Sequence, residues 1–284
     1  MKMTARVKRT AGRWIPPAML DFLRRLARPG AAGSASGGEG QILDGLAAMQ
    51  PMQPAEVQLN GQSFRVVDGP SFAWLYREQF HQEVFRFESS CPRPLMLDCG
   101  ANVGVVTAYL KNRFPDARVV AFEPDPDCFA ALQHNCRSYS GVETVAAAVW
   151  ITEGELEFDP VGAVGGHVAE LSGRNGDADR IRVKAVRLRD YLTEPVEFLK
   201  MDIEGSELAV LEDCRDRLAM VRFLFVEFHS FVGRPQNLGR LVQIVEDAGF
   251  RLHAHGSMEE PQPFLRIPVH NRKDFRLNLF AYRS

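Results

Sequence analysis

Acidic side chains stand at the ends of two successive apolar runs in the first half of the chain. The run 95–99 carries Asp98 and is followed by Gly100 and Gly104, and the run 119–123 ends at Glu123. A strand, a glycine turn and a helix start in this order let the backbone pass close to a ligand. An acid at the end of the second strand is placed to accept hydrogen bonds from ribose hydroxyls. The pair therefore predicts a ligand that carries a nucleoside.

The glycine spacing indicates which nucleoside ligand this is. A dinucleotide site would have a third glycine, and a P-loop would have Lys followed by Ser or Thr; this turn has neither. Asp98 would repel a pyrophosphate but suits an ammonium group. S-adenosylmethionine has an amino group, a sulfonium and a ribose diol, so it fits both acids. Asn102 is expected to cap the following helix. The alternative is an ordinary strand, turn and helix with a solvated acid.

Two further pairs of polar residues end later apolar runs. Asp202 and Glu204 follow Phe198-Leu-Lys-Met, and Glu227 and His229 follow Leu224-Phe-Val. In each pair the residues alternate by two, so they face one side of a strand. We interpret Asp202 and His229 as catalytic or acceptor-positioning residues, with His229 as the general base or its relay.

Glu204 and Glu227 are the other two candidates for the base. Glu204 could instead be an acid favoured by the dipole of the next helix. Glu227 could instead orient His229 or Lys200.

Together these motifs resemble those of a known family. Asp98-Cys-Gly-Ala-Asn-Val-Gly, Phe122-Glu-Pro-Asp, Leu199-Lys-Met-Asp-Ile-Glu-Gly-Ser-Glu-Leu and Val226-Glu-Phe-His occur in this order. The set resembles the FkbM-type methyltransferases, a class I family that uses S-adenosylmethionine, over roughly residues 80–255. The resemblance implies methyl transfer, usually to a hydroxyl oxygen of a glycan, polyketide or other natural product.

We expect the cofactor to lie in the crevice formed by residues 98–104 and Glu123, with its adenine near Ala147 and Ala148. The expected cofactor-binding residues are Asp98, Gly100, Ala101, Asn102, Val103, Gly104, Glu123, Pro124, Ala147, Ala148 and Asp202. Two alternatives of other classes remain: a non-catalytic binding module on the same fold, and an NAD-dependent oxidoreductase.

Strand and helix patterns alternate after residue 95, which favours an α/β fold with a mainly parallel sheet and helices on both faces. Strands are predicted at 95–99, 118–123, 142–149, 196–202 and 222–228, and helices at about 104–113, 126–137, 206–215 and 236–248. Residues 154–192 are predicted to form a β-rich insertion. Its loop, with His167, could cover the acceptor, and the alternative is that His167 is a solvated loop residue. Residues 251–255 and 278–282 are predicted as two antiparallel strands. The family resemblance implies a Rossmann-like, seven-stranded sheet that ends in this pair.

Three parts are predicted: an arm and linker at 1–40, a hairpin and helix cap at 41–94, and the methyltransferase domain at 95–284. Residues 14–28 have the pattern of an amphipathic helix, and 29–40 have the composition of a flexible linker. Asn60-Gly61 between alternating segments predicts a hairpin. Residues 71–87, with aromatics at helical spacing, are predicted to form a wall beside the cofactor, its rings mostly in the core.

Composition excludes several classes of protein. No apolar run reaches the roughly 20 residues of a spanning helix. Residues 1–30 have a net charge of +7 and the whole chain −2, so the remainder is acidic, which argues against a nucleic-acid acceptor. The five cysteines read as reduced thiols of a cytoplasmic enzyme. The basic arm, residues 1–30, could contact an anionic membrane surface or pack on protein.

No metal is expected from the sequence. His253 and His255 share a strand face, but no cysteine or further histidine lies near them in the sequence. The oligomeric state and the identity of the acceptor are left open.

Overall fold

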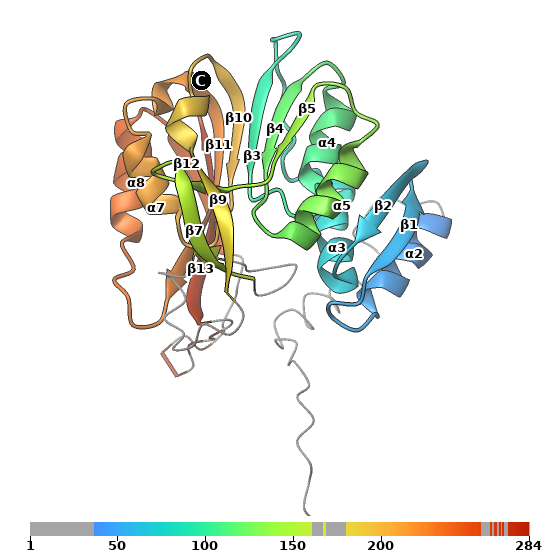
Figure 1. Cartoon of the computed structure of the whole chain (residues 1–284). Helices are drawn as coiled ribbons and strands as arrows, with labels where there is room; N and C mark the ends of the chain where they lie inside the picture. Colours follow the sequence, from blue (N-terminus) through green and yellow to red (C-terminus); the bar gives the residue numbers. More distant parts are fainter. Residues whose placement is uncertain are drawn as a thin grey trace, which may run out of the picture. The chain divides into compact units, whose positions relative to one another are not determined.

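The main sheet has seven strands in the part of the chain that the structure describes (Figure 1). The structure is a computed structural model and describes residues 37–160, 167–168, 180–256, 262, 264–265, 267, 269 and 272–283. The strand order is β12-β13-β11-β10-β3-β4-β5. The strands are β3 (Leu95–Cys99), β4 (Arg118–Phe122), β5 (Val142–Val145), β10 (Val196–Met201), β11 (Val221–Phe231), β12 (Arg251–Gly256) and β13 (Lys273–Tyr282).

Five of these strands run parallel, and the last two complete the sheet antiparallel. β10 pairs parallel with both β3 and β11, and β4 pairs parallel with β3 and β5. β13 pairs antiparallel with β11 and β12. The predicted seven-stranded sheet with its antiparallel end is therefore confirmed.

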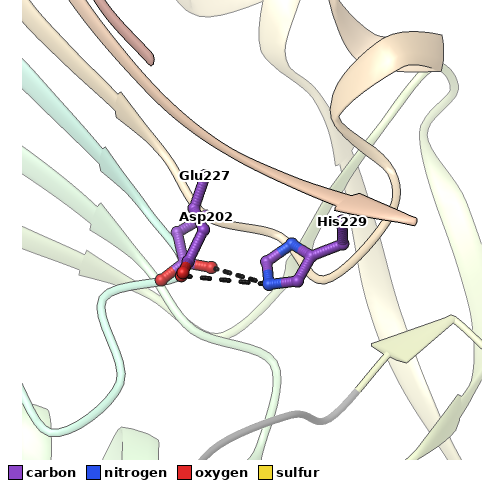
Figure 2. A group of neighbouring side chains, drawn as sticks. All are labelled: Asp202, Glu227 and His229. Atoms are coloured by element: carbon purple, nitrogen blue, oxygen red, sulfur yellow. Dashed lines mark ion pairs between the residues drawn. The ribbon is translucent and has the colours of Figure 1, made fainter. Parts of the chain in front are cut away.

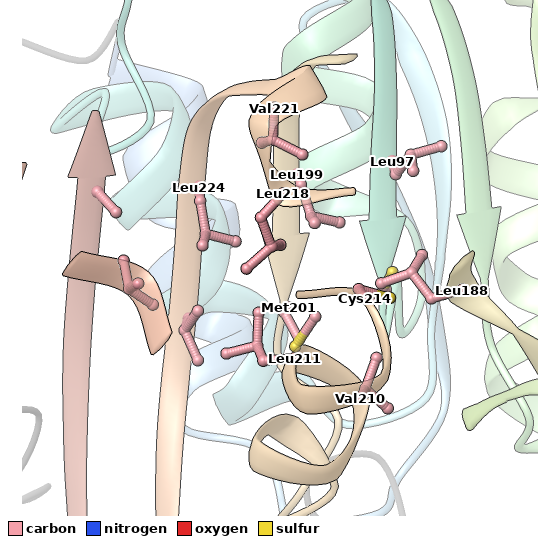
Figure 3. Close-up of a cluster of buried hydrophobic side chains, with 14 of the residues drawn as sticks. Leu97, Leu188, Leu199, Met201, Val210, Leu211, Cys214, Leu218, Val221 and Leu224 are labelled. Atoms are coloured by element: carbon pink, nitrogen blue, oxygen red, sulfur yellow. The ribbon is translucent and has the colours of Figure 1, made fainter. Parts of the chain in front are cut away.

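Helices cover both faces of the sheet, which explains why its central strand β3 is buried along its whole length. All five residues of β3 are buried. Leu97 and Leu199 face α7 (Glu207–Asp213) and α8 (Leu238–Asp247) in one core cluster (Figure 3). Met96 and Phe198 pack in another cluster with α4 (Val105–Arg113). α5 (Pro126–Cys136) packs beside α4.

The N-terminal extension packs on α4 and α5. It comprises α2 (Gly37–Ala47), the antiparallel hairpin β1 (Ala55–Leu59) and β2 (Gln62–Val66), α3 (Gly69–Tyr76) and the π-helix η1 (Arg77–His81). Asn60 and Gly61 both have positive φ angles, as the predicted hairpin turn requires. The helix predicted over 71–87 ends at His81, and Glu83 adopts a left-handed φ of 50°. Phe72 and Tyr76 are buried in the core, as expected, and Phe80 and Phe87 pack partly buried against it.

A second sheet with order β6-β9-β7-β8 forms the predicted β-rich insertion. Its strands are β6 (Ala148–Trp150), β7 (Gly154–Asp159), β8 (His167–Val168) and β9 (Ile181–Arg187). The single strand predicted over 142–149 is wrong, because the chain leaves the main sheet after Val145 and pairs with β9 from Ala148. His167 lies in a strand opposite Asp159 rather than in a loop.

Short helical turns complete the described connections. η2 (Leu188–Tyr191) follows β9, and η3 (Leu218–Met220) precedes β11. Among the described residues, no helix has the length and apolar character needed to cross a bilayer. The helix predicted over 14–28 and the glycine-rich stretch 162–166 lie outside the described residues.

The flexible linker predicted over 29–40 is wrong at its end, because residues 37–40 form the first turn of α2. Leu43 and Leu46 bury the apolar side of this helix, and Glu39 pairs with His81 at 2.7 Å. Tertiary packing thus overrides the poor helix propensity of its glycines.

We expect residues 1–36 to be dispensable for cofactor binding. A truncation that starts at Gly37 should keep wild-type affinity for S-adenosylhomocysteine by calorimetry. A truncation that starts at Gly45 removes Leu43 and should lower the melting temperature, because loss of a buried leucine costs about 2–5 kcal/mol. Loss of binding in the first truncation would show that the arm belongs to the cofactor site.

Candidate active site

The glycine turn after β3 lies against the end of β10. Gly100 has a φ of +79°, and a Cβ built on it would lie 1.9 Å from the backbone oxygen of Asp202. Gly104 has a φ of +85° and faces Leu132 in α5. Only glycine fits both the conformation and the space at residue 100. The turn is therefore packed tightly between the end of β10 and α5.

The predicted cap of α4 is wrong. Gly104 is the N-cap residue and offers no side chain, while Asn102 has a left-handed φ of 52° two residues earlier. The Asn102 side-chain oxygen accepts a hydrogen bond from the Val103 N–H at 2.7 Å. Asn102 thus shapes the turn itself rather than the helix end.

Glu123 holds the glycine turn and the next loop together. Its Oε2 accepts from the Asn102 N–H at 2.7 Å, and its Oε1 accepts from the Asp125 N–H at 2.9 Å. Burial raises the pKa of Glu123 to about 7, against the lowering effect of these two hydrogen bonds. Each carboxylate oxygen has a second lone pair for a ligand.

Asp98 lies fully buried between two partners from other elements. Its Oδ2 accepts from the Thr107 hydroxyl at 2.7 Å, and its Oδ1 lies 3.3 Å from the Lys200 ammonium. Lys200 also donates to the Gly100 carbonyl at 2.7 Å. Burial alone would lower the pKa of Lys200, but Asp98 and Asp202 outweigh it and raise that pKa. In the structure, the ammonium group beside Asp98 is thus that of Lys200. Contact between Asp98 and a cofactor remains a prediction.

The remaining predicted cofactor residues surround this turn and the next two strand ends. Ala101 and Val103 are buried within the turn, Pro124 follows Glu123, and Ala147 and Ala148 are buried at the start of β6. The Ala147 N–H donates to the Val145 carbonyl at 2.9 Å, which turns the chain out of the main sheet. Their contacts with adenine remain a prediction.

Asp202, Glu227 and His229 converge at the ends of β10 and β11 (Figure 2). His229 Nε2 lies 4.0 Å from Asp202 Oδ1 and 3.8 Å from Glu227 Oε2. The His229 side chain is 1% exposed and that of Asp202 is 29% exposed, so Asp202 is the more accessible of the two. The residues that the sequence places near the ends of two strands thus lie together in one group of side chains.

Glu207, which the sequence analysis did not assign, fixes the imidazole of His229. Its Oε1 lies 3.0 Å from His229 Nδ1 and also accepts from the Gly205 N–H at 3.0 Å. Glu227 lies near the other ring nitrogen, so the alternative in which Glu227 orients the ring by holding it is wrong. Glu207 could have been found from the sequence, because it belongs to the same motif as Glu204.

The acids around His229 change its protonation. Burial alone would lower the pKa of His229, but the carboxylates of Glu204 and Glu207 outweigh it and raise that pKa to about 9. Burial, with the charge of Asp202, raises the pKa of Glu227 to about 7. His229 therefore carries a proton at neutral pH, and a base role requires that this proton leave first.

Strand β13 supplies two cations that the sequence analysis also missed. Lys273 pairs with Glu204, and Arg276 lies 3.9 Å from Glu227. Burial alone would raise the pKa of Glu204, but Lys273 and His229 outweigh it and lower that pKa to about 2. Glu204 thus belongs to an ion pair, whereas Glu207 is the acid in the first turn of α7. No local pattern signals Lys273, because only antiparallel pairing brings β13 beside β11.

The π-helix η1 adds a further carboxylate. Burial raises the pKa of Glu78 to about 7, and the charges of Glu227 and Asp202 raise it further. The N-terminal extension therefore brings an acidic group within electrostatic range of the site, and π-helical turns are frequent at functional sites.

The family follows from a match that spans more than half of the chain. Residues 98–252 match the family described as the methyltransferase FkbM domain. The chain belongs to the FkbM methyltransferase family. The family resemblance noted in the sequence is confirmed, and the chain is a methyltransferase by family.

Three relatives show how far this similarity extends. The methyltransferase sdnD of Sordaria araneosa is 25% identical over 253 residues, which cover 75% of this chain and 95% of the relative. The 31-O-demethyl-FK506 methyltransferase FkbM of Streptomyces tacrolimicus is 27% identical, covering 69% of this chain and 88% of its own length. The hexuronic acid methyltransferase AglP of Haloferax volcanii is 28% identical, covering 66% and 80%.

The FkbM match covers both strand-end groups of the site. It begins at Asp98 and includes Glu123, Asp202 and His229, but ends before Lys273 and Arg276. The cations of β13 therefore lie outside the matched residues, although they contact acids inside them.

Proposed function

We propose that this FkbM-family chain binds S-adenosylmethionine and transfers its methyl group to a hydroxyl oxygen of a glycan or another small natural product. The observation that supports this most directly is the meeting of the glycine turn with the Asp202 backbone. It sets the predicted cofactor crevice beside the group formed by Asp202, Glu227 and His229. Two of the relatives are named for a hexuronic acid and for 31-O-demethyl-FK506, which supports an oxygen acceptor.

The residues of the crevice fit this cofactor. Both Glu123 oxygens keep lone pairs that can accept from a ribose diol. Asp98 and Lys200 form a buried ion pair next to the turn. When bound, S-adenosylmethionine supplies a methyl group on a sulfonium, a good leaving group that needs no redox step.

In this proposal the acceptor oxygen sits against Asp202 and His229. The new O–CH₃ bond forms as the S–CH₃ bond breaks, and the hydroxyl proton passes to a carboxylate. Asp202 is our choice for that carboxylate, because its side chain is partly exposed. His229, whose ring Glu207 holds, positions the acceptor oxygen. The chain's main contribution is to orient the acceptor in a site that excludes water.

Binding measurements separate this function from the two alternatives. We expect S-adenosylhomocysteine, but not NAD, to raise the melting temperature and to bind by calorimetry. A screen of glycan and polyketide acceptors with a labelled methyl donor then tests for transfer. Binding of NAD alone would favour an oxidoreductase, and cofactor binding with no transfer to any acceptor would favour a non-catalytic module.

Glu123 should make cofactor affinity depend on pH. Glu123→Ala should weaken S-adenosylhomocysteine binding by about 10–150-fold, the loss of hydrogen bonds to a charged group worth about 1.5–3 kcal/mol. Because the folded pKa of Glu123 is raised above its unfolded value, the protonated form stabilises the free protein. That contribution is lost as pH rises through about 7.

The carboxylate accepts from the ribose, so affinity should increase between pH 6 and pH 8. Glu123→Gln keeps the volume of the side chain but cannot ionise, so it is the matched control and its affinity should vary less with pH. Asp125 and Lys200 also face Glu123, and both variants retain them. Equal pH profiles in the wild type and in Glu123→Gln would contradict the assignment.

A further inference from the structure

We propose that Asp202, Glu227 and His229 bind one divalent metal cation, and that the cation holds the acceptor of the reaction proposed above. One ligand atom from each residue, a nitrogen and two carboxylate oxygens, lies within 4.8 Å of the others. Two strands supply the three ligands, since Asp202 follows β10 directly and the other two lie on β11. The role in holding an acceptor rests on the proposed function, whereas the cation site itself does not.

The orientation of His229 is that of a metal ligand with a supporting carboxylate. Glu207 holds Nδ1 at 3.0 Å, so Nε2 is the ring nitrogen available for coordination. Figure 2 shows Nε2 directed toward Asp202 and Glu227. The side chain is 1% exposed, and Nε2 lies 3.4 Å from Glu204 Oε2 but makes no hydrogen bond within the part of the chain that is described. A buried ring nitrogen without a hydrogen bond is costly, and a cation would satisfy it.

Asp202 also lacks a hydrogen bond on the side that faces His229. Its Oδ1 is buried and lacks a hydrogen-bond partner among the described residues, although it lies 4.0 Å from Nε2. Two of the three ligand residues thus direct an unpartnered buried atom at one point. The distances of 3.8–4.0 Å are too long for hydrogen bonds but leave space for an ion between the atoms.

The charges around the group also favour a divalent ion. Among the described residues, the connected carboxylates are Asp98, Asp202, Glu204, Glu207 and Glu227, and the connected cations are Lys200, Lys273 and Arg276. Five carboxylates face three cations apart from His229, so a divalent cation would reduce the excess of negative charge at the group.

The donor set indicates the metal and the acceptor class. One imidazole and two carboxylates suit Mn²⁺ or Zn²⁺ better than Ca²⁺, which prefers oxygen ligands alone. Three protein ligands leave coordination positions open for substrate oxygens. We therefore infer an acceptor that presents two neighbouring oxygens, such as the vicinal hydroxyls of a sugar, one of which receives the methyl group.

A binding titration without acceptor tests the site. The full chain is treated with EDTA, desalted and titrated with Mn²⁺ while the EPR signal of the free ion is followed, and Zn²⁺ is tested in competition. We expect one Mn²⁺ per chain in the wild type. Asp202→Asn, Glu227→Gln and His229→Gln should each weaken it at least about tenfold, and Glu207→Gln should weaken it about 10–100-fold through ligand orientation.

The exposed histidines of β12 provide the matched control. The double variant His253→Gln with His255→Gln removes the other histidine pair and should keep wild-type Mn²⁺ affinity. Circular dichroism spectra that match the wild type show that the fold of every variant is intact. Failure of both Mn²⁺ and Zn²⁺ to bind the wild type, or binding retained in His229→Gln, would overturn the proposal. Loss of S-adenosylhomocysteine binding by the wild type would instead overturn the proposed function.

Discussion

His229→Gln should lower the single-turnover rate of methyl transfer by about 10²–10⁴-fold, the range typical of a side chain that assists proton transfer at the reacting oxygen. The side chain is buried beside Asp202 and Glu227, and its Nε2 points at both. Cofactor affinity should hardly change, because the predicted ribose contacts come from Glu123 on another strand. Rate, affinity and melting temperature are measured on the same preparation, with an acceptor found in the labelled-methyl screen.

The competing explanation makes His229 a core residue that supports β11. It predicts a lower melting temperature with turnover retained in the folded protein. His253→Gln repeats the substitution at an exposed position on β12 and should leave all three measurements unchanged. Glu207→Gln should lower the rate by shifting the orientation of the ring, and a change in the pH profile would separate this from simple destabilisation. A stable, cofactor-binding His229→Gln with wild-type turnover would exclude the catalytic role.

Gly100→Ala should destabilise the protein by about 3 kcal/mol or more and abolish cofactor binding. The residue has a φ of +79°, and the new Cβ would lie 1.9 Å from the Asp202 backbone oxygen. Backbone cannot yield as a flexible side chain can, so the turn or the end of β10 must move. Denaturant unfolding and calorimetry with S-adenosylhomocysteine measure the two effects.

Gly61→Ala separates backbone strain from the steric clash. Gly61 has a similar φ of +75°, but a Cβ there would meet nothing within 4 Å. Its cost should be about 1–2 kcal/mol, the penalty of a left-handed conformation alone, and cofactor affinity should be retained. Equal losses in the free energy of unfolding for Gly100→Ala and Gly61→Ala would show that the close contact with β10 adds nothing to the cost of the Gly100 substitution.

The order and type of the central elements could be predicted from the sequence because burial on both faces leaves a strong local signal. β3 has the predicted bounds, and β4, β10 and α5 differ by a residue or so, since apolar runs and helix patterns mark them directly. The prediction was wrong where local pattern and long-range pairing disagree. Val142 to Val149 reads as one apolar run, yet its two halves join different sheets.

The sequence by itself determined the family, the fold class and the residues that end the strands, because motifs such as Lys200-Met-Asp-Ile-Glu keep their spacing along one strand and turn. Only the tertiary structure decided which charges meet. Lys273 reaches Glu204 across 69 positions, Lys200 neutralises Asp98 across two strands, and Glu207 rather than Glu227 holds the ring of His229. Electrostatic energy depends on distance in space and on burial, and neither is encoded in the local spacing of residues.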